Sequence, residues 1–105
     1  MAWVYLIVAG LMEVGWPIGL KMAGSAETRI SGILIALFFM AGSGGLLWLA
    51  QKSIPMGTAY GVWTGIGAAG AFLVGVLFYN DPLTFWRSIG VLLIISGVVV
   101  LKMAA

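Results

Sequence analysis

Long stretches without a charged side chain dominate this sequence. None occurs from residue 30 to 51, and none from residue 53 to 80. A bilayer core about 30 Å thick takes roughly 20 apolar residues as a helix, so each stretch is long enough to cross one. Charged residues make up 8% of the chain and apolar residues 63%, whereas an average soluble domain is about 25% charged. The sequence therefore predicts an all-α integral membrane protein.

The remaining apolar stretches give the number of spans. The stretch from 3 to 20 is apolar apart from Glu13, and no charge occurs from 88 to 101. Short connections with prolines at 55 and 82 force neighbouring helices antiparallel. We expect the first span to be kept rather than cleaved, because it has no basic leader and carries a carboxylate. We predict one domain over residues 1–105 with four transmembrane helices, near 3–21, 30–51, 57–79 and 84–102.

The cations give almost no bias in orientation. With the N-terminus inside, Lys52 and Lys102 lie inside, whereas Lys21, Arg29 and Arg87 lie outside. The positive-inside rule counts Lys and Arg in short loops, and two against three is nearly balanced. Either the orientation is set by features that charge does not report, or the protein inserts both ways and pairs as an antiparallel dimer. The charges leave both alternatives open.

The residue types exclude several kinds of site. There is no Cys and no His, which excludes disulfides, thiol nucleophiles and His-based metal sites. The net charge is +2, yet five scattered cations form no nucleic-acid-binding patch. An enzyme is not expected, because only Glu13 could do acid–base work and it has no catalytic partner. We expect no metal, cofactor or nucleic acid to bind.

Glu13 is the most informative residue, because it lies at mid-membrane depth. An ionisable group there costs several kcal/mol and is by default a functional hypothesis. The structural alternative is a neutral Glu that is hydrogen-bonded within the bundle. Lys21 lies two turns away at the helix end, so no fixed cation partners Glu13 at its depth. Such a carboxylate binds either a proton or a cation, and competition between the two is the basis of an antiporter.

The neighbours of Glu13 on its helix fit this hypothesis. Gly10, Trp16 and Pro17 share a face with Glu13, since they lie three or four residues from it. Pro17 has no N–H, so the carbonyl of residue 13 loses its intrahelical donor and a local kink is predicted there. Trp16 either donates its indole N–H to the carboxylate or packs against the third span.

Polar and aromatic side chains on other spans are candidates for the same site. Ser43 lies among glycines near the middle of the second span. It either bonds a backbone carbonyl one turn earlier or lines a cavity. Tyr60 and Trp63 project to one side of the third span, and each carries a donor on a flat apolar body. The alternative for this aromatic pair is the interfacial belt of a membrane protein.

The sequence contains 16 glycines, and in lipid small residues let helices approach closely. Gly67 and Gly70 lie off the main small face of the third span, so that helix is expected to contact neighbours on two sides. That face has a small residue at every fourth position: Gly57, Gly61, Gly65 and Ala69.

A second small face lies on the fourth span. Gly90 and Gly97 are seven residues apart, with Leu93 and Ile94 between them, and all fall on one face. The face packs either within the protomer or against a second copy. A solute cavity lies more plausibly between two protomers, which makes this face a candidate dimer contact.

The chain resembles the small multidrug resistance family over essentially its whole length, and three segments carry the resemblance. The first helix, with Glu13-Val14-Gly15-Trp16 before Leu20-Lys21, is similar to the guanidinium-exporter subtype. The run from Ile54 to Ala68 resembles the third-helix signature, and Gly90 to Val98 resembles the dimerisation segment. The resemblance implies a four-helix, dual-topology protein that works as an antiparallel homodimer. It also implies a multi-pass protein of a prokaryotic inner (plasma) membrane.

The family resemblance also implies a mechanism and residue roles. The protein would be a proton-coupled exporter of guanidinium and small guanidinyl cations, with protons and substrate competing for Glu13. Trp16 and Ser43 would orient the carboxylate, Tyr60 would couple binding to the conformational switch, and Trp63 would wall the pocket. Gly10 would allow close helix approach. Guanidinium fits physically, because its N–H pairs match the two oxygens of a carboxylate.

Two positions depart from the family pattern. Pro17 stands where a small unconstrained residue is usual, and Gly44 and Gly45 stand where bulkier side chains are usual. The resemblance places the second helix beside a lateral opening to lipid, so we expect Gly44 and Gly45 to widen this portal. The alternative function is therefore a broad exporter of quaternary ammonium and other lipophilic cations. A proton-translocating ring subunit would have two spans rather than four, and a holin would not need Glu13.

Overall fold

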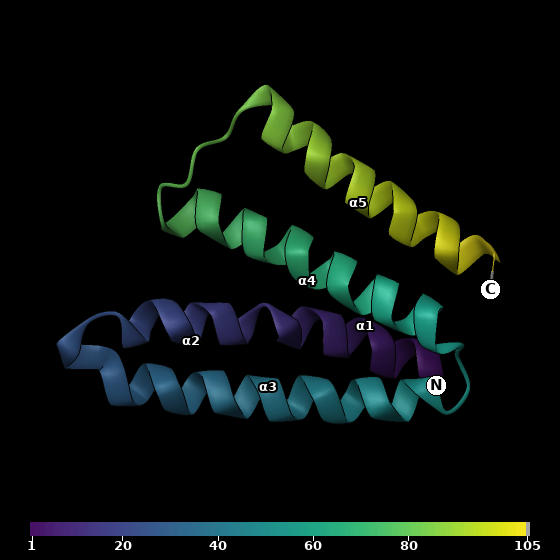
Figure 1. The fold of residues 1–105 in the computed structure, drawn as a ribbon, viewed down its shortest axis with the longest axis horizontal. Helices are drawn as coiled ribbons and strands as arrows, with labels where there is room; N and C mark the ends of the chain where they lie inside the picture. The colour runs from purple at the N-terminus through teal and green to yellow at the C-terminus, as the bar shows by residue number, and fades with distance from the viewer. Residues whose placement is uncertain (105) are drawn as a thin grey trace.

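The computed structural model describes residues 1–104, and these residues form helices joined by short turns (Figure 1). A one-turn 3-10 helix, η1, spans Ala26–Thr28. The α-helices are α1 (Ala2–Glu13), α2 (Gly15–Ala23), α3 (Arg29–Gln51), α4 (Met56–Phe78) and α5 (Phe85–Ala104).

The prediction of four helices that are long and apolar enough to cross a membrane is confirmed. Helices α1 and α2 together form the first, and the others coincide with α3 (with η1), α4 and α5. Their bounds are Ala2–Ala23, Ala26–Gln51, Met56–Phe78 and Phe85–Ala104. The protomer measures 45 Å along its longest axis, enough to cross a hydrocarbon core of about 30 Å.

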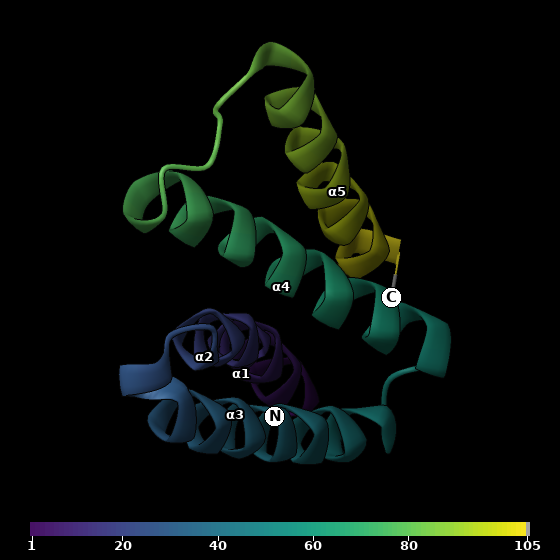
Figure 2. The same ribbon diagram turned by 60° about the vertical axis from the view of Figure 1, so that its left-hand side comes forward.

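The helices lie side by side in the order α3, α1–α2, α4, α5 (Figures 1 and 2). Helix α1 packs against both α3 and α4, whereas α2 packs mainly against α3. Helix α5 packs mainly against α4 and diverges from it toward the connecting loop. No residue of α5 is buried.

The buried core lies at the end of the protomer that holds the α3–α4 turn. Val98 and Leu101, from the C-terminal half of α5, pack against this core. At the opposite end, α2 packs closely on α3. The core residues are Leu6, Ala50, Ile54, Ala59 and Val62.

The first span is interrupted at Val14, directly after Glu13. The Val14 N–H donates to the carbonyl of Leu11, at 3.2 Å, instead of the carbonyl four residues earlier. Pro17 supplies no N–H for the carbonyl of residue 13, so the interruption lies where the proline predicts it. Val14 keeps helical dihedral angles, φ −66° and ψ −29°, and α1 and α2 therefore remain nearly in line (Figure 1). The predicted kink is wrong: the helix loses a hydrogen bond here without a change of direction.

Helices α2 and α3 touch backbone to backbone through two glycines. A Cβ added to Gly32 would fall within 3.0 Å of backbone atoms of Gly19, Met22 and Ala23. A Cβ added to Gly19 would meet the backbone of Gly32 in turn. Both contacts exist only because the side chains are absent, which is how small residues hold helices together in lipid.

The variant Gly32→Ala tests this contact. The added methyl group forces two backbones apart, and overpacking of this kind costs about 1–3 kcal/mol. We expect a lower unfolding midpoint in detergent, measured by circular dichroism against temperature. Gly57→Ala is the control, because a Cβ there meets no atom within 4 Å. Equal midpoints for the two variants would contradict the packing role of Gly32.

Candidate functional site

Glu13 is the last residue of α1 and lies near the middle of the span Ala2–Ala23. Its side chain is half-buried. The indole N–H of Trp16 donates a hydrogen bond to Glu13 Oε1. This contact follows from the spacing of three residues, which brings the two side chains to the same face of the first span.

Helix α4 lies close to α1 on both sides of Glu13. A Cβ on Gly67 would overlap the side chain of Glu13, and a Cβ on Gly10 would overlap Ile66. Gly67 lies on α4 and faces a side chain of α1, whereas Gly10 lies on α1 and faces a side chain of α4. The Glu13 side chain therefore occupies the space that the missing Gly67 side chain leaves on α4.

The Glu13 carboxylate opens into a groove of about 220 Å³ between the first span and α4. It is the only ionisable group in the groove, since the other lining residues are aromatic, small or apolar, with one hydroxyl. The residues that line it are Glu13, Trp16, Pro17, Thr64, Gly67, Ala68 and Ala71. We call this space the Glu13 groove.

Ser43 links three helices rather than reaching Glu13. Its Oγ donates to the carbonyl of Ala9 on α1, at 2.7 Å. The indole N–H of Trp63, on α4, donates to the same Oγ at 2.8 Å. The expected bond to a carbonyl of its own helix is not the one formed. Its hydrogen-bond partners within residues 1–104 are Ala9 and Trp63, so the role implied by resemblance, orienting the carboxylate, remains a prediction.

Tyr60 and Trp63 stand next to each other on α4. Their ring centroids are 5.4 Å apart and the rings are inclined at 41°. Tyr60 is 56% exposed, whereas Trp63 is half-buried on Ser43. Tyr60 lies seven residues before Gly67, about 10 Å along the helix. Within one protomer it is therefore two turns away from the Glu13 carboxylate.

The portal and dimer-contact candidates lie on open surfaces of the protomer. A Cβ on Gly44 or Gly45 would meet no atom within 4 Å, and the same holds for Gly90 and Gly97. On α5, Leu93 is 68% and Ile94 is 40% exposed. The face on α3 is free, whereas on α5 Ile94 also lies against Gly65 of α4. The portal and dimer roles of these residues remain predictions.

The family model described as Small Multidrug Resistance protein matches residues 1–94. The chain belongs to this family. The first-span motif around Glu13, the third-span glycines and most of the fourth-span face lie within the matched residues.

Individual relatives match over the whole chain. A guanidinium exporter of Yersinia pseudotuberculosis is 44% identical over 105 residues, which cover all of both chains. A guanidinium exporter of Proteus vulgaris is 38% identical, also over the whole of both chains. A guanidinium exporter of Salmonella typhimurium is 40% identical over all of this chain and 99% of its own. The relatives are named as exporters, so the comparisons indicate no enzyme.

Some residues of the Glu13 groove were not predicted from the sequence. Thr64, Ala68 and Ala71 line it from α4, and Gly67 contacts Glu13 directly. The sequence did place Gly67 off the main small face of its helix, which indicated a second contact surface. The sequence does not say how α4 is oriented about its own axis in the bundle. It therefore could not show that this surface faces Glu13.

Ser43→Ala tests the three-helix link. The change leaves the carbonyl of Ala9 and the indole N–H of Trp63 without their partner, and a buried group left unsatisfied costs about 1–3 kcal/mol. We expect a lower free energy of unfolding, measured by titration with denaturing detergent, and a shifted Trp63 fluorescence. Ser88→Ala, which removes an exposed hydroxyl bonded to the carbonyl of Thr84 just before α5, should cost below about 0.5 kcal/mol. Equal losses in the two variants would argue against the link.

Proposed function

We propose that the chain is a proton-coupled antiporter that exports guanidinium and small guanidinyl cations. Protons and substrate compete for Glu13, and transport proceeds by alternating access. The observation that carries this proposal is the position of Glu13: a carboxylate in the middle of a span, bonded to Trp16 and facing an open groove.

The cations of the chain support this proposal, because all five are held away from Glu13. Arg29 donates its Nε–H to the carbonyl of Ala23 at 3.2 Å. The other four lie over aromatic rings near helix ends: Lys21 over Tyr79, Lys52 over Trp48, Arg87 over Phe72 and Lys102 over Trp3. Glu13 therefore has no resident counter-ion, and a carboxylate in the membrane must take a proton or a mobile cation.

The groove also fits a guanidinium ion. This cation is planar and weakly hydrated, and it donates paired N–H bonds to the two oxygens of a carboxylate. Trp16 is bonded to Oε1 and fixes the orientation of the carboxylate. The full-length relatives named as guanidinium exporters support the same substrate.

A complete transport pathway needs a second copy of the chain. Helix α5 has no buried residue, and Gly90, Leu93 and Gly97 lie on its open side, next to Ile94, which touches α4. An antiparallel copy packed on this face would bring two Glu13 carboxylates to one cavity, and exchange of about two protons per cation would follow. The bacterial relatives and the four spans support a multi-pass protein of a prokaryotic inner membrane.

A second candidate function is broad export of quaternary ammonium and other lipophilic cations. The open space at Gly44 and Gly45 favours it, because missing side chains on α3 leave room for an apolar tail of a substrate. This candidate shares Glu13 with the first and differs in the range of substrates.

Replacing Glu13 tests the central claim. Glu13→Gln removes the charge and the exchangeable proton at nearly constant volume, so guanidinium-driven current in proteoliposomes should be lost. Glu27→Gln is the control, since Glu27 lies exposed in η1, at the very end of its span and far from the middle of the membrane. A coupled current that survives in Glu13→Gln would overturn the proposal.

The competition between protons and substrate predicts the sign of the pH dependence. As pH falls, more Glu13 is protonated and less is free to bind a cation, so the apparent Kd for guanidinium should rise. Where protonated Glu13 predominates, the rise is about tenfold per pH unit for each competing proton. Binding can be measured by calorimetry on the purified protein, and an apparent Kd that does not change with pH would contradict the competition.

The portal is tested by filling it. The double variant Gly44→Leu/Gly45→Leu should abolish transport of alkylated cations while sparing guanidinium, because only substrates with apolar tails need the space. Both substrates are measured as currents in the same proteoliposomes. Equal loss of both would contradict the portal.

A further inference from the structure

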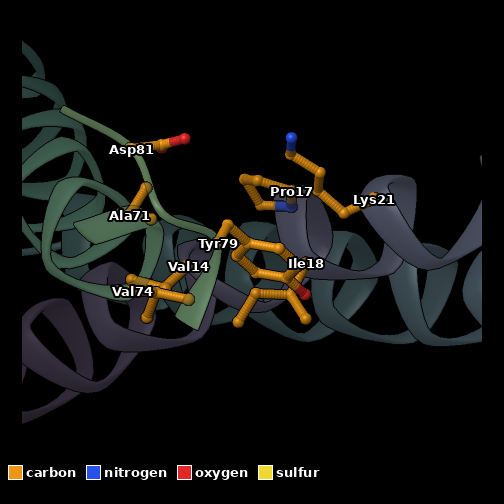
Figure 3. Close-up of a pocket in the computed structure, with 9 residues that line it drawn as sticks. Val14, Pro17, Ile18, Lys21, Ala71, Val74, Tyr79 and Asp81 are labelled. Carbon is orange, nitrogen blue, oxygen red and sulfur yellow. The ribbon is translucent and has the colours of Figure 1, made fainter. Parts of the chain in front are cut away.

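A second pocket lies beyond the Glu13 groove, at the end of the protomer that holds Lys21 (Figure 3). It has a volume of about 240 Å³ and is enclosed by α2, α4 and the loop after α4. Unlike the Glu13 groove, it is lined by groups of both charges. An aromatic ring lines it as well. Its lining residues include Lys21, Tyr79 and Asp81. We call it the outer pocket.

The outer pocket adjoins the Glu13 groove. Pro17 and Ala71 line both spaces, so the two share a boundary formed by the first span and α4. Lys21 lies eight residues beyond Glu13 on the first span, and Gly75 lies eight residues beyond Gly67 on α4. Eight helical residues rise about 12 Å, which places the outer pocket near the membrane surface and Glu13 near the centre.

The turn that ends α4 holds the Asp81 carboxylate against this pocket. Asn80 has a positive φ of 57°, a conformation that commonly ends helices. The chain then folds back, and the Asp81 N–H donates to the carbonyl of Gly75 at 3.0 Å. A Cβ on Gly75 would overlap the carboxylate of Asp81. The glycine therefore lets the carboxylate lie directly on α4.

The pocket already holds a tethered cation. The Lys21 Nζ lies 5.5 Å from the centroid of the Tyr79 ring, within the range of a cation–π contact. Lys21 and Asp81 extend along the same side of the pocket, with Pro17 between them (Figure 3). A ring face and a carboxylate are thus presented together, which is a suitable combination for a planar monovalent cation.

We propose that the outer pocket is a second binding site for the transported cation, at the membrane surface. Asp81 and Tyr79 take a guanidinium-type cation from water, and Lys21 is the resident cation that the substrate displaces from the ring. The identity of this ligand rests on the proposed function, whereas the existence of the site rests on the pocket. The substrate would thereby lose its water in two steps, once at the outer pocket and once at Glu13.

Binding in a Glu13→Gln background tests the site alone, because this variant lacks the central carboxylate. The probe is guanidinium chloride, titrated against sodium chloride into the full-length protein in bicelles. We expect the amide NMR signals of Tyr79 and Asp81 to shift with weak affinity. Adding Asp81→Asn should weaken the binding by about tenfold, whereas adding Glu27→Gln should leave it unchanged.

The outcomes separate this proposal from the proposed function. Signals of Tyr79 and Asp81 that do not respond in Glu13→Gln would overturn the outer site, as would equal binding with and without Asp81→Asn. Binding in Glu13→Gln combined with no guanidinium transport by the unmodified protein would overturn the proposed function and leave the site intact.

Transport kinetics give a second test. In proteoliposomes Asp81→Asn should raise KM for guanidinium about fivefold with kcat unchanged. The variant binds the cation less well at the outer pocket but still has Glu13 at the central site. Lys21→Met should lower KM, since the competing cation is gone. Raising ionic strength should reduce both effects, because salt screens charges at the membrane surface. A matching increase in KM for Glu27→Gln, or a change confined to kcat, would contradict the proposal.

Discussion

Close contact between helix backbones is the constraint on which this protomer depends. Moving an apolar side chain from lipid to a helix–helix interface gains little free energy, so helices in lipid associate through tight packing. The contacts gather on the first span, where Gly15 receives the ring of Phe39 and Gly19 meets α3. On the other side, Gly70 of α4 lies directly against Val14. The first span is thus the central element of the bundle. It lies between α3 and α4 and carries Glu13 near its middle.

This packing divides the polar groups into two kinds. Ser43, Ala9 and Trp63 satisfy one another across three helices, and no buried side-chain nitrogen or oxygen in residues 1–104 lacks a partner. Such a satisfied network fixes the positions of helices and leaves no hydrogen-bonding group free to bind a solute. Glu13 is different, because its carboxylate accepts a bond from Trp16 and still faces the groove. The protein therefore keeps one polar group available in an otherwise satisfied interior.

The sequence predicts features that lie on one helix better than those that lie between helices. Charge-free stretches predicted four long apolar helices. Pro17 predicted the lost hydrogen bond after Glu13 and also a kink, which is not seen. The bond from Trp16 to Glu13 was one of two alternatives that the sequence left open. The partner of Ser43 was not predicted, because periodicity gives the face of a residue and not the helix opposite that face. The outer pocket was missed for the same reason, since Lys21 lies on α2 whereas Tyr79 and Asp81 lie in the loop after α4. The antiparallel dimer, the portal and the role of Tyr60 remain predictions.

The divergence of α5 from α4 has a consequence for the behaviour of the protein in different bilayers. Helix α5 contacts the buried core only through Val98 and Leu101 near its C-terminal end, and the rest of its packing within the chain is against α4. The angle between α5 and α4 therefore depends on the molecules that pack along the exposed side of α5. Bilayer thickness and acyl-chain order act directly on that angle, so lipid composition becomes a determinant of the shape of the protomer.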